Sequence, residues 1–288
     1  MSDPVQRVFG GFVVMGSVVA GMVLGVVVYL AVKPTGEEAN PYEYSLAAYE
    51  HVDSSLRLYE ETGSVKIPIA DACGLAVDSR GNVYVAGRDA ILICDADGKE
   101  TRRIPRAEGA RCVAVDGAGR ILVGTTNHVE VFDPNGGSDW VSWESLGEQA
   151  LITSISCGTN EVFVADAGNR QVWVLDLQGV LRTVTDGKDA ARGKDSVTND
   201  AGFILPSANF DVAAETGGGV WVANPGRQRL ELYTADGRFM WYWGKSGMQP
   251  DAFCGCCNPS HLALGPDGRI YTAEKGMPRV KVYGRTGA

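Results

Sequence analysis

Histidine and positive charge are both scarce in this chain of 288 residues, and each shortage argues against a class of function. The three histidines, His51, His128 and His261, belong to no Ser-His-Asp or His-Glu-x-x-His pattern, so no catalytic residue is predicted. Acidic residues number 35 against 26 lysines and arginines, which gives a net charge of −9. A protein that binds a phosphate backbone presents a cationic face, so no nucleic-acid partner is predicted.

Long apolar runs are also missing, with one exception near the amino terminus. The segment Val8–Val32 contains no charged residue and exceeds the ~20 residues that a helix needs to cross a bilayer. It is too long for the apolar part of a cleaved signal peptide, and Lys33-Pro34 ends it. The sequence therefore predicts a tail (1–7), an uncleaved transmembrane signal-anchor helix (8–33) and a juxtamembrane linker or short helix (34–55).

The charges that flank this helix predict its orientation. Arg7 lies on the amino-terminal side, whereas Lys33 is followed by Glu37, Glu38 and Glu43. Because positive charge favours the cytoplasmic side, we expect a single-pass protein of the inner (cytoplasmic) membrane. Its amino terminus would be cytoplasmic, and the rest of the chain would be extracytoplasmic, which in a diderm bacterium means periplasmic.

Three small residues form a stripe on one face of this helix, because Ser17, Gly21 and Gly25 are four residues apart. Such stripes let two helices approach closely in lipid, which predicts partner subunits packed against the helix. The alternative is that glycine is simply common in transmembrane helices.

The remainder, residues 56–288, repeats one phrase of short apolar runs separated by Gly, Pro and Asp. Copies begin at Gly74, Val113, Ser154, Phe210 and Pro259. Runs of this length with such breakers are typical of antiparallel strands, and a fourth run follows each copy except the last. Units of four strands at this spacing predict an all-β fold of the β-propeller type.

These units resemble NHL repeats, whose hairpin has the form Val-Ala-Asp-x-x-Asn-x-Arg. The segment Val164–Arg170 matches closely, and 224–229 and 274–279 match more loosely. The resemblance implies a propeller, with six blades favoured and five allowed. It leaves function open, because the family includes scaffolds, binding modules and a few metal-dependent enzymes. Its amidating lyases use several channel histidines that this chain does not supply.

The two ends of the repeat region predict how the ring closes. Residues 56–59 and 64–67 alternate like the last two strands of a blade, whereas the final copy, which ends at Tyr283, lacks its fourth strand. We expect an amino-terminal strand to complete the last blade.

Cysteines gather before the innermost strand of three copies. Cys73 and Cys112 precede the first two copies, and Cys254, Cys256 and Cys257 precede the last, whose inner strand opens with His261. Because inner strands of a propeller start at one mouth of the channel, we expect these residues near one another. Cys94 and Cys157 are interpreted as small core residues.

Two kinds of site fit this cluster. Disulfides among Cys73, Cys112, Cys254, Cys256 and Cys257 would suit an oxidising compartment. A metal or iron–sulfur site on Cys254, Cys256, Cys257 and His261 would use soft ligands, although the spacing matches no standard zinc or ferredoxin motif. Packed free thiols are the third interpretation.

Three functions are compatible with these features. The first is a membrane-anchored docking or structural subunit of a larger membrane complex, whose partners would be other membrane subunits and the lipid bilayer. The second is an exported redox or metal-binding protein, attached to an electron-transfer complex and built on Cys254–Cys257. The third is a hydrolase or lyase at the channel mouth. No cofactor is predicted apart from the metal or iron–sulfur alternative.

Overall fold

The structure is a computed structural model, and it describes residues 53–106, 109–135, 139–188, 202–276 and 279–287. All of these residues belong to one compact unit, Tyr49–Ala288. Within these ranges no helix combines the length and the apolar character needed to cross a bilayer. The predicted tail, the helix at 8–33 with Ser17, Gly21 and Gly25, and nearly all of the linker at 34–55 lie outside the described residues.

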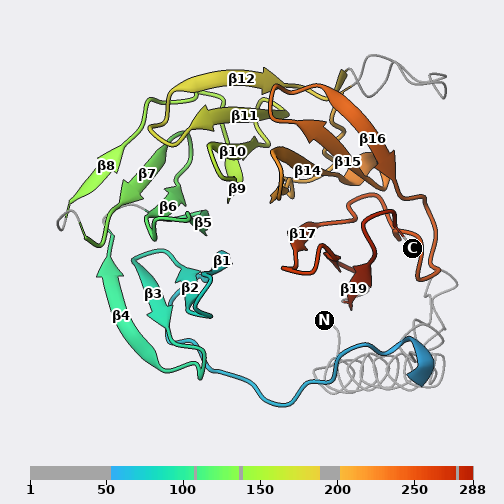
Figure 1. Ribbon diagram of the computed structural model, residues 1–288, viewed down its shortest axis with the longest axis horizontal. Helices are drawn as coiled ribbons and strands as arrows, with labels where there is room; N and C mark the ends of the chain where they lie inside the picture. Colours follow the sequence, from blue (N-terminus) through green and yellow to red (C-terminus); the bar gives the residue numbers. More distant parts are fainter. Residues whose placement is uncertain (1–52, 107–108, 136–138, 189–201, 277–278, 288) are drawn as a thin grey trace, which may run out of the picture. The chain divides into compact units, whose positions relative to one another are not determined.

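The described residues form five antiparallel sheets whose strands follow the order of the sequence (Figure 1). The sheets are the blades of a β-propeller. Blade 1 contains β1 (Gly74–Val77), β2 (Val83–Ala86), β3 (Ala90–Cys94) and β4 (Glu100–Pro105). Blade 2 contains β5 (Cys112–Val115), β6 (Ile121–Gly124), β7 (Val129–Phe132) and β8 (Trp140–Ser142). Blade 3 contains β9 (Ile152–Cys157), β10 (Glu161–Asp166), β11 (Gln171–Asp176) and β12 (Leu181–Thr185). Blade 4 contains β13 (Val212–Glu215), β14 (Gly219–Asn224), β15 (Arg229–Thr234) and β16 (Phe239–Trp243). Blade 5 contains β17 (His261–Leu264), β18 (Ile270–Glu274) and β19 (Arg279–Tyr283).

Aspartates fix the turns between these short strands, as the sequence predicts. In the turn from β5 to β6, Asp116 Oδ1 accepts hydrogen bonds from the backbone N–H groups of Ala118 and Arg120, at 2.9 and 2.8 Å. Gly119 in the same turn has a φ of 83°, which is unfavourable for residues with a side chain. Asp78, Asp95, Asp133 and Asp176 accept backbone N–H groups in the same way. These aspartates therefore stabilise the turns between strands.

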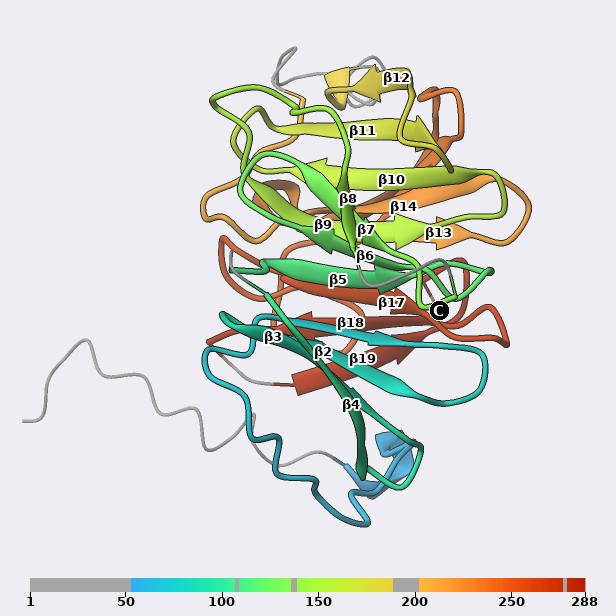
Figure 2. The same ribbon diagram turned by 90° about the vertical axis from the view of Figure 1, so that its left-hand side faces the viewer.

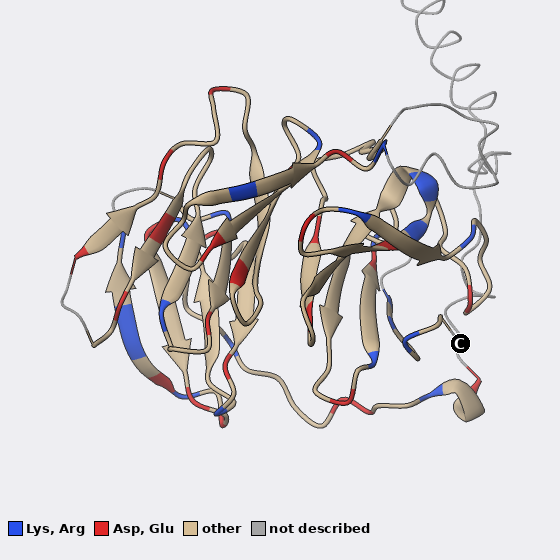
Figure 3. Cartoon of the chain, turned by 45° about the horizontal axis from the view of Figure 1, so that its top comes forward, with Lys and Arg blue, Asp and Glu red and all other residues tan. Residues whose placement is uncertain are grey.

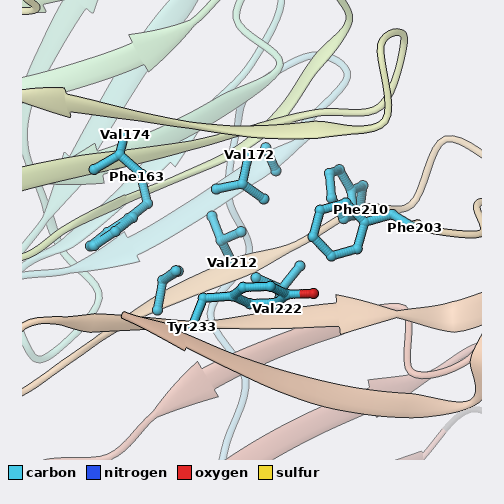
Figure 4. Packing of buried hydrophobic residues seen from close by; sticks show 10 residues of the cluster. Phe163, Val172, Val174, Phe203, Phe210, Val212, Val222 and Tyr233 are labelled. Atoms are coloured by element: carbon cyan, nitrogen blue, oxygen red, sulfur yellow. The ribbon is translucent and has the colours of Figure 1, made fainter. Parts of the chain in front are cut away.

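The hydrophobic core lies between consecutive blades. Separate clusters of buried residues fill the interfaces of blades 1 and 2, 2 and 3, 3 and 4, and 4 and 5. Between blades 3 and 4, Phe163 and Val174 face Val222 and Tyr233 (Figure 4). Alternation along each strand sends every second side chain to the opposite face, so an inner blade packs against both of its neighbours.

The innermost strands pack in order, β1 on β5, β5 on β9, β9 on β13 and β13 on β17. Seen from the side in Figure 2, β5, β13 and β17 point the same way. The first residues of these strands therefore lie at one end of the unit, and this end is called the mouth.

Two expectations about closure of the ring are wrong. Six blades were favoured, but the described residues form five, and the fifth has only three strands. Residues 56–59 and 64–67 do not form strands either. A short 3₁₀ helix, Ser54–Leu56, is followed by an extended segment, 57–72, which is called the strap.

The strap contacts both end blades. Near its start, the hydroxyl of Tyr59 lies 2.7 Å from that of Tyr271 in blade 5. Further along, Ile67 and Ile69 pack against a small cluster of blade 1 made of Val85, Leu92 and Cys94. The strap therefore links the last blade to the first through side chains and through one backbone hydrogen bond, from the Arg88 N–H to the carbonyl of Ala70, but it is not paired as a strand.

Candidate functional site

The mouth brings together residues that precede different inner strands, and Asp211 is central among them. It lies just before β13, is 8% exposed, and bonds to blade 5. Its Oδ2 accepts the backbone N–H of Leu262 at 2.9 Å and lies 3.2 Å from Nδ1 of His261. Its Oδ1 accepts the N–H of Val212 at 2.9 Å. One carboxylate therefore joins the inner strands of blades 4 and 5.

His261 opens β17, as predicted, but its partner is a carboxylate and not a thiol. The hydrogen bond to Asp211 raises the pKa of His261 above its ordinary value of 6.5, while burial of the ring acts in the opposite direction. The His261 side chain is 63% exposed and that of Asp211 12% exposed, so the pair is partly screened by water. This arrangement ties two strands together, and the ring remains accessible at the mouth.

Cys73 and Cys112 lie on neighbouring blades, as expected, and the backbones there approach closely. A Cβ atom placed on Gly74, the residue after Cys73, would lie 2.9 Å from the Cα of Cys112, so only glycine fits at that position. The Cys73 thiol donates to the carbonyl of Ala110 at 2.8 Å. Cys112 is buried, and burial raises the pKa of its thiol to about 12. Both sulfurs therefore remain as neutral thiols near pH 7.

The loop Cys254–Cys257 holds the other thiols, and it precedes β17 as expected. The sulfurs of Cys256 and Cys257 lie 3.4 Å apart. Cys257 also accepts a hydrogen bond from the Ser207 hydroxyl, which together with the contact to Cys256 lowers the pKa of Cys257. The loop therefore forms its own cluster with Ser207.

All seven cysteines lie within the described residues, and all seven are free, so none of the expected disulfides is formed. In the described part of the chain no group of three or more His, Cys, Asp or Glu side chains is arranged to hold a metal ion. The predicted metal or iron–sulfur site on Cys254, Cys256, Cys257 and His261 stays a prediction. Cys94 is buried in blade 1 and Cys157 packs into the core between blades 2 and 3, in agreement with their interpretation as core residues.

Each hairpin that resembles the NHL motif encloses a carboxylate that serves the fold. In blade 3, Asp166 accepts hydrogen bonds from the side chains of Asn169 and Trp173, at 2.7 and 3.2 Å. In blade 4 the equivalent region uses Glu231, which is fully buried and accepts from Arg229 at 2.7 Å and from Tyr233 at 2.6 Å. These carboxylates hold strands together and are not exposed to a ligand.

The second feature of interest is the pair of blade faces that have no neighbouring blade. On blade 1, Leu75 is 68% and Val77 is 61% exposed, and both point to the face opposite the interface with blade 2. On blade 5, Val280 is 70% exposed and shares a face with Ala273 and His261 through the strand register. These two faces, which are called the seam, flank the strap. The strap itself adds exposed apolar residues, Leu58 and Tyr59 at 56% and 60%.

Charge is distributed without a single cationic surface. Figure 3 shows Lys and Arg interspersed with Asp and Glu along strands and turns. Several of these residues are paired, including Arg120 with Asp116 at 2.7 Å and Arg182 with Asp176 at 2.7 Å. The seam combines the exposed aliphatic side chains of Leu75, Val77 and Val280 with polar ones, those of Arg103, Glu100 and His261.

No family model matches the chain, and no curated protein matches its sequence. Solved structures share the fold. Virginiamycin B lyase from Staphylococcus aureus is 11% identical, with 75% of this chain and 70% of that one covered and a TM-score of 0.49. A streptogramin B lyase is 14% identical, with 76% and 70% covered and a TM-score of 0.49. U3-55K is 11% identical, with 70% and 60% covered and a TM-score of 0.50.

The described residues form a five-bladed β-propeller. At such identities the likeness to these structures concerns the fold alone. The NHL resemblance found in the sequence is not confirmed by a family match.

The sequence did not reveal several residues of the mouth and of the thiol loop. Asp211, Ser207 and Lys275 are each separated from their partners by many residues. The only signal for Asp211 was its position directly before an inner strand, which Ser260 shares. A polar residue directly before an inner strand is therefore the sequence signal for such a contact.

Proposed function

We propose that this protein is a docking subunit of a membrane protein complex, and that its propeller holds a partner subunit at the seam. The observation that carries this proposal is the exposure of Leu75, Val77 and Val280 on the two blade faces without a neighbour. Large aliphatic side chains exposed together on a folded domain favour a protein contact over contact with water.

The expected occupant is a second protein chain that presents an apolar edge or segment. Blade interfaces elsewhere in this unit are filled by aliphatic and aromatic side chains, as in the cluster around Trp221 and Leu262. The seam presents the same kind of strand face, with Ile67 and Ile69 of the strap covering only part of it. An apolar segment inserted there would bury the remaining side chains and gain roughly 25 cal/mol for each Å² of apolar surface removed from water.

The amino-terminal sequence supports the membrane part of the proposal. A helix at 8–33 would hold the propeller on the extracytoplasmic side, and its stripe of Ser17, Gly21 and Gly25 would pack against a helix of the same partner complex. The protein would then contact one complex twice, in lipid and at the seam. Binding at either contact would raise the effective concentration of the protein at the other.

Two exposed valines allow a matched test. Val280 lies at the seam and is 70% exposed, whereas Val141 lies on the outer strand of blade 2 and is 62% exposed. The full-length protein, affinity-tagged in its native cells, is extracted in mild detergent, and its partners are identified by mass spectrometry. We expect Val280→Asp to lose partner subunits that Val141→Asp retains, because a carboxylate at an apolar contact must be desolvated.

The proposal is overturned if the wild-type protein is extracted alone, or if both variants retain the same partners. Folding of each variant is checked by fluorescence of the buried tryptophan Trp221. A reporter fused after Ala288 that is active only in the cytoplasm tests orientation separately, because activity of that reporter contradicts an extracytoplasmic propeller.

A further inference from the structure

The loop Cys254–Cys257 is fixed at both ends, although its thiols reach the surface. On one side Phe253 is fully buried, and on the other Asn258 is 3% exposed. The Asn258 amide nitrogen donates to the carbonyls of Cys254 and Lys275 at 2.6 and 2.9 Å, and its Oδ1 accepts the N–H of Lys275 at 2.9 Å. The loop is therefore held in place by β18 and its following turn, while Cys256 remains exposed and Cys257 half-buried.

The two neighbouring thiols are joined to a chain of polar groups from other parts of the propeller. The ammonium of Lys275 lies 3.2 Å from the hydroxyl of Ser207, which it donates to. Ser207 also neighbours the Cys257 thiol, whose sulfur lies 3.4 Å from that of Cys256. Two thiols in contact beside a hydroxyl and an ammonium group form a cluster in which one sulfur can become a thiolate while the other supplies a thiol.

The pKa directions distinguish the two sulfurs of this cluster. The hydrogen bond from Ser207 is the largest cause of the lowered pKa of Cys257, whereas the contact with Cys257 raises the pKa of Cys256. Partial desolvation raises the pKa of Cys73, the other exposed thiol. The thiols of Cys257 and Cys73 can therefore be compared within one protein, because the pKa of Cys257 is lowered and that of Cys73 is raised.

We propose that Cys256 and Cys257 form a thiol–disulfide exchange site, in which Cys257 attacks a low-molecular-weight disulfide and Cys256 resolves the product. In the first step the Cys257 thiolate bonds to one sulfur of the disulfide, the S–S bond breaks, and one thiolate leaves. In the second step Cys256 loses its proton, and its sulfur attacks Sγ of Cys257 and expels the second thiolate. Two protein thiols are oxidised to one disulfide, and one disulfide is reduced to two thiols.

The product would be a disulfide between adjacent residues, and this makes the site reversible. Consecutive Cα atoms across a trans peptide are ~3.8 Å apart, which is shorter than the ~4.4 to 6.8 Å usual for disulfides. A strained disulfide is reduced more readily than a structural one. The site therefore suits cycling between two states, a function that lies beyond docking at the seam and does not depend on it.

The test uses the full-length protein in detergent, reduced, desalted and exposed to oxidised glutathione. Trypsin should release residues 246–269 as one peptide, which contains Cys254, Cys256 and Cys257 and no other cysteine. In the wild type we expect this peptide to be two hydrogens lighter, with Cys254 still open to alkylation. Cys256→Ser should accumulate one glutathione on Cys257, because the resolving thiol is gone.

Two controls separate this mechanism from its alternatives. Cys254→Ser should leave formation of the Cys256–Cys257 disulfide unchanged, whereas a pairing of Cys254 with Cys257 would abolish the loss of hydrogens in this variant. Ser207→Ala should slow attack by Cys257 about three- to tenfold, because it removes a donor to the thiolate. The rate at Cys73, measured in the same sample, should not change.

The proposal is overturned if Cys256→Ser accumulates no mixed disulfide, or if the disulfide joins Cys254 instead. Wild-type protein alone gives a second readout that needs no variant. Iodoacetamide near neutral pH should label Cys257 before Cys73, and labelling in the opposite order contradicts the activation of Cys257.

Discussion

Replacement of Asp211 by alanine should separate blade 5 from blade 4 at their inner strands. The carboxylate accepts two backbone N–H groups, those of Val212 and Leu262, in a buried environment. A buried donor left without an acceptor costs about 1 to 3 kcal/mol. Two donors left without their acceptor would therefore destabilise the protein by roughly 2 to 6 kcal/mol.

Neighbouring groups narrow this range. The Val212 N–H also lies 3.4 Å from the Ser154 hydroxyl, which can accept it once the carboxylate is gone. The Leu262 N–H, in the inner strand of blade 5, donates to Asp211 Oδ2 and would lose this acceptor. We therefore expect Asp211→Ala to lower the free energy of unfolding by about 1 to 3 kcal/mol. Asp211→Asn keeps one carbonyl acceptor and should cost less.

Urea titration of the detergent-solubilised protein, followed by tryptophan fluorescence, measures this change. Trp221 and Trp243 are 0% and 8% exposed and lie in the core between blades 4 and 5, so their emission reports on that interface. Asp267→Ala is the matched control, because Asp267 lies in blade 5 and bonds to the N–H of Arg269, but is exposed. It should change stability by less than about 1 kcal/mol. If the two variants are equally stable, the argument from Asp211 fails.

Three further predictions concern other parts of the chain. Because Asp211 raises the pKa of His261 above 6.5, the stability that this pair contributes is complete below that value and disappears as pH rises through the folded pKa. His261→Gln should therefore cost more stability near pH 5.5 than near pH 9, as measured by urea titration, and an equal cost would contradict this. Phe203→Ala should cost about 3 to 5 kcal/mol, because the ring is 1% exposed, whereas Ile204→Ala, at 36% exposed, should cost clearly less in the same titration. Gly21→Leu should release partner subunits during native purification while tryptophan fluorescence shows a folded propeller, and full retention of partners would refute the helix contact.

Local sequence patterns predicted the blades because each blade is a local structure. The hairpin Val164–Arg170 joins β10 to β11, and the glycine turns separate strands where the apolar runs end. Each of these signals involves residues a few positions apart, so the chain order alone reveals them. The absence of a fourth strand in blade 5 was visible for the same reason.

The strap was predicted wrongly because alternation does not distinguish a strand from an extended segment. Residues 56–59 and 64–67 alternate, but backbone pairing depends on a partner that the local pattern does not contain. In the structure, Ile67 and Ile69 cover part of the outer face of blade 1, and Tyr59 bonds to Tyr271. The number of blades is a global property of the ring, and the family resemblance favoured the wrong number.

The candidate sites were predictable only in part. The cysteine loop stood out in the sequence, but Ser207 and Lys275, which bond to each other beside it, come from other segments of the propeller. Asp211 acts on His261 across 50 residues, and no spacing rule connects them. Contacts between blades require the fold itself.

The open seam also has a consequence for how the propeller comes apart. Four core clusters join consecutive blades, whereas in the described part of the chain the first and last blades are linked through the strap. The unit therefore behaves as a linear array of repeats with two ends, whose stability is a sum over neighbours. Hydrogen exchange should reflect this, with the slowest amides in blade 3 and faster exchange toward blades 1 and 5. A subunit bound at the seam would contact blades 1 and 5 together. Every blade would then have two neighbours, and the ring would unfold cooperatively.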